Sequence, residues 1–427
     1  MKPLNIEEFL IWYFILFTYV IYALGLLFPA TALLAWVLFF LVIKRSKSIC
    51  VSWRLWMWCI CMVVILFATY MGIDDFKLGA NAQLRGTLGW LTTSAVFALF
   101  ILSGCLNIRP QLIYRAVCIL CLQSLVAIPI TFIAYQLNLP DILYSSPVER
   151  FIQNGPIFYQ VGFYAIDYDT QSLRLFLFAP WCPALGLIGN IYFFLALEEK
   201  NRFWRYIGII GAVAMSIVSV SRSAFVALPV VLVLTWLLRN LFKPKIQVIS
   251  GLVCFFSGIF STNLLELFKN TSEEFSSSRA SSSRVRSALV RIALDRWKEA
   301  KIWGHGTQDP GPKVVANLPI GSHHTWAGLL FAKGATGFLA FMLPFVISFF
   351  DLALKSYTSK VAKVSLSVLL VLLIFSFGEQ VDILGYLCFP GLILIGMGLQ
   401  EQPSYFTTIN PCHAERSEAS HKYRNVL

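Results

Sequence analysis

Long apolar runs recur along the chain from Phe9 to Leu399, and shorter polar stretches separate them. A helix needs about 20 predominantly apolar residues to cross the hydrocarbon core of a bilayer. Helices are the expected spanning structures, because they satisfy their backbone hydrogen bonds internally. The pattern therefore predicts an all-α polytopic membrane protein with about twelve transmembrane helices, some of them short. We expect them at about positions 9–27, 29–43, 53–70, 90–106, 117–135, 175–197, 207–220, 225–241, 246–263, 326–350, 364–377 and 383–399.

Two of the polar segments between these runs are long. One covers about 136–173, and the other covers about 264–325, between the ninth and tenth runs. Within the second, apolar residues recur at helical spacing from Val285 to Ala300, while Arg291 and Asp295 share the opposite face. We therefore expect a large loop that contains an amphipathic helix able to lie at the membrane interface.

The composition agrees with this pattern and excludes a soluble fold. Hydrophobic residues make up 58% of the chain and charged residues 13%, whereas soluble proteins carry about 25% charged residues. The net charge of +12 indicates basic cytoplasmic loops first, and not nucleic-acid binding. If the helix count is right, five basic clusters share one side of the membrane, which we predict to be the cytoplasmic side, together with both termini. The clusters are Lys44, Arg45 and Lys47; Arg109 and Arg115; Lys200, Arg202 and Arg205; Arg239, Lys243 and Lys245; and Lys355, Lys360 and Lys363.

The two long segments then face the opposite compartment, where segment 264–325 departs from the charge rule. Seven lysines and arginines lie between Arg279 and Lys301 against two acidic residues, and three of the five histidines of the chain follow or join them. Histidine exchanges protons near neutral pH, and arginine binds phosphate through two parallel hydrogen bonds. This combination suits a reaction on a lipid-linked diphosphate. Contact of the arginines with anionic headgroups, with ordinary polar roles for the histidines, explains the composition equally well.

Short motifs occur in order from the sixth run to the tenth. Arg174 leads into the sixth run, and Ser219-Val-Ser-Arg222-Ser-Ala lies between the seventh and eighth. Trp303-Gly-His-Gly ends the amphipathic stretch, and His323-x-x-Trp326 precedes Gly334-x-x-Gly337 at the start of the tenth. Together they resemble the O-antigen ligase and polymerase family, which are bacterial GT-C membrane glycosyltransferases acting on polyprenyl-diphosphate-linked glycans. The resemblance extends from about Arg174 to Gly337.

The resemblance implies a role for each matching position. His323 would be the catalytic base, with Arg222 and Arg291 as catalytic arginines; we prefer Arg291 among its neighbours because it shares a helix face with Asp295. His324 stands where the family usually has asparagine. The reaction implied is an inverting displacement that uses no cofactor and no metal, because guanidinium groups neutralise the departing diphosphate. The residues expected to bind substrate are Arg174, His324, Arg284, Arg296 and His305.

Two alternatives compete with this interpretation. Asp167-Tyr-Asp169 is a D-x-D pattern, which in many glycosyltransferases binds a divalent cation, although a lone D-x-D is a weak signal. A secondary transporter or a flippase for lipid-linked oligosaccharides would also suit about twelve helices with an arginine beside a span. The small number of charges in the spans and the unlike halves of the chain count against a transporter.

We divide the chain into N-terminal helices with the first long loop (1–173), a ligase- or polymerase-like core (174–400) and a disordered cytoplasmic tail (401–427). The resemblance implies a polyprenyl-diphosphate-linked glycan as donor and a glycan, a lipid or lipid A-core as acceptor. It further implies a multi-pass protein of the bacterial inner membrane, in contact with the lipid bilayer, with its active site facing the periplasm.

Overall fold

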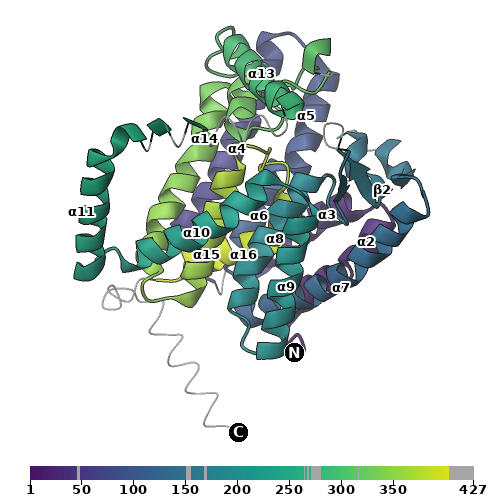
Figure 1. Ribbon diagram of the computed structural model, residues 1–427. Coiled ribbons are helices and arrows are strands. Elements are labelled where there is room, and N and C mark those ends of the chain that lie inside the picture. The colour runs from purple at the N-terminus through teal and green to yellow at the C-terminus, as the bar shows by residue number, and fades with distance from the viewer. Residues whose placement is uncertain are drawn as a thin grey trace.

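The computed structural model describes residues 1–45, 49–150, 155–167, 171–263, 265–266, 269–270, 280–315 and 317–402. It is a bundle of helices with small strands on one flank (Figure 1). The helices are α1 (Ile6–Leu16), α2 (Thr18–Ala23), α3 (Leu27–Arg45), α4 (Trp53–Asp75), α5 (Ala80–Thr92), α6 (Ser94–Ser103), α7 (Pro110–Gln136), α8 (Cys182–Leu197), α9 (Arg202–Val218), α10 (Arg222–Asn240), α11 (Pro244–Ile259), α13 (Ala280–Trp297), α14 (Thr325–Lys355), α15 (Lys360–Phe375) and α16 (Gly385–Gln400).

The mostly helical, polytopic fold is confirmed. Six helical stretches of the described chain are long and apolar enough to cross a membrane, and three shorter apolar helices accompany them. The predicted count of about twelve spans therefore remains a prediction. The six are Leu27–Arg45, Trp53–Asp75, Ala80–Ser103, Pro110–Gln136, Arg222–Asn240 and Thr325–Lys355, and the shorter ones are Cys182–Leu197, Pro244–Ile259 and Gly385–Gln400.

The first long segment corrects the all-α expectation. It contains two pairs of antiparallel strands. Strand β1 (Ile142–Ser145) pairs with β2 (Gln160–Gly162), and β3 (Tyr164–Ile166) pairs with β4 (Leu173–Leu175). Such three- and four-residue strands are too short to leave an alternating pattern in the sequence. Strand β4 matters for the site, because it carries Arg174 and is the last strand before α8.

The fourth predicted span also begins earlier than its apolar run. The helical stretch starts at Ala80, well before the predicted start near position 90, and bends at Thr93 between α5 and α6. Asn81, Gln83 and Arg85 interrupt the apolar pattern in its first turns. The hydropathy pattern therefore missed α5. Some of its polar residues line a cavity, as described below.

The predicted amphipathic helix is confirmed as α13. Leu289 and Ala293 are fully buried, whereas Arg291, Asp295 and Lys298 are exposed on the other face. Helix α13 lies at one end of the bundle near α5, and the N-terminus lies at the other end (Figure 1). Of the predicted tail 401–427, all but the first two positions lie outside the described residues.

Candidate active site

A buried carboxylate, Glu379, lies at the centre of the candidate site, in the turn between α15 and α16. Its side chain is 1% exposed. Trp181 Nε1 donates to Glu379 Oε2 at 2.8 Å, and Arg286 Nη2 donates to Oε1 at 3.2 Å. His323 Nδ1 is 3.9 Å from Oε2. A buried charge is stable only when it is paired and hydrogen-bonded, so three distant parts of the chain are held together around this carboxylate.

The backbone of Glu379 is fixed to the start of α14. Thr325 Oγ1 donates to the Glu379 carbonyl at 2.7 Å and accepts from Val381 N at 2.9 Å. The Thr325 amide in turn donates to the Ser376 carbonyl at 2.9 Å. These bonds make a rigid frame, so the distance between Glu379 and the turn that carries His323 is set by backbone contacts and not by side-chain freedom alone.

His323 sits in a left-handed backbone conformation, with φ +63°. This conformation is uncommon for residues other than glycine and clusters at functional sites. It places the imidazole with Nδ1 toward Glu379, while the side chain stays 30% exposed. Within the described part of the chain, Nε2 makes no hydrogen bond. The ring therefore has one nitrogen facing a carboxylate and the other available to a substrate.

The electrostatics keep Glu379 ionised. Burial opposes the charged form, but the nearby His323 imidazole, the positive charge of Arg286 and the Trp181 N–H outweigh it, so the pKa of Glu379 lies below its ordinary value of 4.5. An ionised carboxylate beside an imidazole stabilises the protonated ring and fixes which nitrogen carries the proton.

Arginines from two helices lie at or near this centre. Arg222 is the first residue of α10, and its Nη2 donates to Ser283 Oγ of α13 at 3.0 Å. Arg286, which bonds Glu379, lies on the same helix one turn after Ser283. Residues of both helices lie close to Gly378, which precedes Glu379. A Cβ on Gly378 would lie 3.4 Å from Ser223 Oγ and 3.8 Å from Arg286 Nη1. The starts of α10 and α13 therefore converge on the Glu379 turn.

Arg174 holds the turn that precedes Arg222. Its Nε and Nη2 both donate to the Ser219 carbonyl at 3.2 Å, at the end of α9. Its Nη1 donates to Asp167 Oδ2 at 3.3 Å. Asp167 is the first carboxylate of the D-x-D pattern, and Asp169 lies outside the described residues. Asp167 thus supports Arg174, and in the described ranges no group of three or more His, Cys, Asp and Glu residues could hold a metal ion.

His305 lies in a packed setting, away from the Glu379 turn. Its ring stacks between Phe76 and Phe331, with centroids 4.7 and 4.5 Å away, and the side chain is 3% exposed. Nδ1 is 3.1 Å from the Phe331 carbonyl, and Nε2 is 3.3 Å from Glu299. Both nitrogens are therefore engaged, which leaves neither for a substrate.

The structure separates the predicted arginines of α13. Arg296 Nη1 bonds Asp309 at 2.9 Å, and its guanidinium lies 5.3 Å from the Phe331 ring centroid. Arg284 and Arg291 are exposed. The structure brings Arg286, and not the preferred Arg291, to Glu379 and His323. The reason is helical geometry, because sharing a face with Asp295 carries Arg291 away from the face that meets α14.

His324 caps α14. Its Nδ1 accepts a hydrogen bond from Ala327 N at 3.1 Å. Burial lowers the pKa of His324, and a neutral Nδ1 is what this bond requires. Asparagine is among the best N-cap residues, so the departure from the family pattern noted above preserves a capping function.

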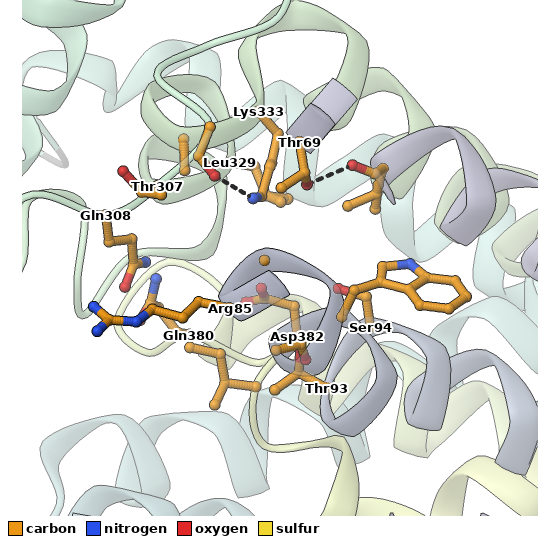
Figure 2. A pocket seen from close by; sticks show the side chains of 18 of the residues that line it. Thr69, Arg85, Thr93, Ser94, Thr307, Gln308, Leu329, Lys333, Gln380 and Asp382 are labelled. Atoms are coloured by element: carbon orange, nitrogen blue, oxygen red, sulfur yellow. Dashed lines mark hydrogen bonds between the residues drawn. The ribbon is translucent and has the colours of Figure 1, made fainter. Parts of the chain in front are cut away.

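The turn that carries Glu379 also forms part of the lining of a cavity of about 780 Å³ (Figure 2). Arg85 of α5, Lys333 of α14, and Gln380 and Asp382 of the turn contribute to its lining. Sequence reasoning missed these residues and Glu379. The available signal was charge inside or between apolar runs, since an ionisable residue in a membrane segment is costly and usually functional. Lys333 interrupts the tenth run, and Glu379-Gln-Val-Asp382 separates the last two.

Comparison with known proteins agrees with the motifs. Residues 207–342 match the family model described as O-antigen ligase. No curated protein matches the chain. The matched stretch contains Arg286 and His323, which meet Glu379, and Arg222, which bonds Ser283 one turn before Arg286. Over residues 207–342 the chain is therefore similar to the O-antigen ligase family, as the resemblance of its motifs indicated.

Proposed function

We propose that this protein is a membrane glycosyltransferase of the O-antigen ligase or polymerase type. It transfers a glycan from a polyprenyl-diphosphate carrier to an acceptor hydroxyl at the outer face of the bacterial inner membrane. The observation that carries the proposal is the contact of His323 with the buried carboxylate Glu379, which Arg286 also bonds. His323, Arg286 and Arg222 all lie in the stretch that matches the family model. The acceptor is a hydroxyl of a glycan, a lipid or lipid A-core.

His323 acts as the general base. Its Nε2 takes the proton of the acceptor hydroxyl as the oxygen attacks C1 of the donor sugar. The bond between C1 and the diphosphate oxygen breaks from the opposite side, so the configuration at C1 inverts. Glu379 faces Nδ1 and stabilises the imidazolium that forms, because its carboxylate is charged before the reaction begins.

Arg222 and Arg286 hold the departing diphosphate. Each guanidinium has five N–H donors in a fork that matches phosphate oxygens. The 3.2 Å bond to Glu379 engages one nitrogen of Arg286, so further donors can meet the phosphates. Arg174 positions Arg222 through its two bonds to the Ser219 carbonyl. In this mechanism fixed guanidinium groups supply the neutralisation that a divalent cation supplies in D-x-D enzymes.

The test is transfer by the purified protein from a polyprenyl-diphosphate-linked glycan in excess chelator. We expect glycan transfer with release of polyprenyl diphosphate, and loss of transfer in Arg222→Ala. Product size distinguishes a ligase, which adds one finished glycan, from a polymerase, which adds repeats. Transfer that stops in chelator and returns with Mg²⁺ or Mn²⁺ would overturn the arginine mechanism.

A further inference from the structure

The cavity and the proposed catalytic cluster share one stretch of chain. The Glu379 side chain faces His323, whereas the next residue, Gln380, lines the cavity. Gly328 of α14 packs closely against this turn, because a Cβ on it would lie 3.0 Å from Gln380 Nε2 and 2.8 Å from the Gly321 carbonyl. A molecule in this cavity would therefore lie beside the turn that carries Glu379.

The charges that line the cavity are unbalanced. Arg85 and Lys333 are its cations, and Asp382 is its one carboxylate among the described lining residues. Lys333 Nζ donates to the Gly306 carbonyl at 2.9 Å, which leaves two further donors (Figure 2). Arg85 is exposed and forms no ion pair within the described ranges. The surplus positive charge favours an anionic group on the ligand.

The remaining lining is suited to hydroxyl groups. Asp382 Oδ1 is buried without a hydrogen-bond partner in the described structure, and an unsatisfied buried acceptor calls for a donor. Amide side chains of Gln308 and Gln380 accompany it, and Trp90 and Phe158 offer aromatic surface. Few polar groups placed on an aromatic wall are typical of small-molecule sites, and the volume lies within their usual range of about 300–1,000 Å³. A sugar fits such a lining, because it carries several hydroxyl groups on a ring whose faces are apolar.

We propose that this cavity binds an acidic sugar of the acceptor glycan. Arg85 and Lys333 bind its carboxylate or phosphate group, and Asp382 accepts a hydrogen bond from a hydroxyl. The glycan is thereby held at the turn that carries Glu379, the partner of His323. The proposal rests on the proposed function, because it names the acceptor class of the same reaction. It makes Arg85 a specificity-determining residue that does not contact the reacting atoms.

The test is binding to the full-length protein in lipid nanodiscs. Three probes of one backbone are compared: an oligosaccharide with one glucuronic acid, its carboxyl-reduced form, and the reduced form carrying one phosphate monoester. We expect an acidic probe to bind about tenfold more tightly than the reduced one, as one charge-assisted contact worth about 1.4 kcal/mol would give. The tighter of the two acidic probes identifies the anionic group. Equal affinity for all three probes overturns the proposal.

The variant Arg85→Gln is expected to remove most of this preference without changing affinity for the reduced probe. The matched control is Lys313→Gln, which removes one exposed charge from segment 264–325 outside the cavity lining and should leave the preference intact. An unchanged preference in Arg85→Gln contradicts the assignment. If the protein selects the acidic probe but transfers no glycan, the proposed function fails alone; if it transfers glycan without any preference, the cavity proposal fails alone.

Discussion

His305 and His323 lie in the same polar segment and each comes shortly after a glycine, yet their surroundings differ in exposure, stacking and hydrogen bonding. His305 is 3% exposed, stacked between two phenylalanines, and both its nitrogens are engaged. His323 is 30% exposed, held in a left-handed backbone conformation, and faces an ionised carboxylate with only one nitrogen. Residue type and charge pattern therefore find both histidines, but only packing separates a structural ring from a candidate base.

The same contrast applies to the carboxylates that each ring meets. Glu299, beside His305, is largely exposed, whereas Glu379 is buried and bonded by Trp181 and Arg286. Buried charges are retained at a cost in stability, so a buried and satisfied carboxylate beside a half-exposed imidazole is better explained by catalysis than by packing.

Removing the charge of Glu379 should give the largest effect. In Glu379→Gln the shape is kept but the imidazolium of His323 loses its counter-charge, so we expect kcat for glycan transfer to fall about 100-fold or more with little change in KM. Initial rates with varied acceptor measure this. The control is Glu299→Gln, which should transfer normally; equal rates for the two variants would erase the contrast between the two regions.

Substitutions of Arg286 and Arg291 should affect glycan transfer differently, because the two residues lie on different faces of α13. Arg286→Lys loses the planar fork that bonds Glu379 and, in our proposal, the diphosphate, so we expect transfer to fall about tenfold or more. Arg291→Lys should change transfer less than about twofold, because Arg291 is exposed on the face away from Glu379. Donor KM and kcat of the two variants decide the point, and the reverse ranking would restore the sequence-based choice of Arg291.

His305→Ala should affect stability and not chemistry. The loss of stacking against Phe76 and Phe331 is expected to lower the free energy of unfolding by about 2 kcal/mol. Transfer per folded molecule should stay unchanged. Thermal unfolding in detergent, together with the rate normalised to folded protein, tests both parts. A normal unfolding midpoint with lost transfer would show that His305 belongs to the active site.

The smallest effect is expected at the cap of α14. His324→Ala should cost about 1 kcal/mol of stability, and His324→Asn much less, because asparagine is a strong N-cap. The pKa of His324 is lowered from 6.5 in the folded protein, so its contribution is complete above pH 6.5 and is lost as the pH falls through the lowered value. Unfolding midpoints measured across this range should show a smaller loss in acid for His324→Asn.

Sequence reasoning predicted the elements with a strong period and missed those set by tertiary contacts. The apolar runs and the amphipathic face of α13 were predictable because each depends on local spacing. Helix α5 was missed because Asn81 and Arg85 interrupt its apolar pattern while lining the cavity. The choice of Arg291 over Arg286 depended on which face of α13 meets α14, and local spacing carries no information on that.

Glu379, in the candidate active site, could not be assigned from the sequence for the same reason. It lies 56 residues after His323 in the sequence, outside the matched stretch that ends at residue 342, and no short motif joins the two. Its proximity to His323 comes from the bonds of Thr325 to the turn between α15 and α16. A lone carboxylate between two apolar runs was the signal available, and it indicates a functional group without naming its partner.

The central claim, that His323 is the base, is tested most directly by glycan transfer from a polyprenyl-diphosphate donor, measured for purified His323→Ala beside His305→Ala. We expect His323→Ala to fold and insert normally and to lose transfer by about 100-fold or more, the usual contribution of a general base, while His305→Ala transfers at the normal rate per folded molecule. Full transfer by folded His323→Ala would contradict the assignment.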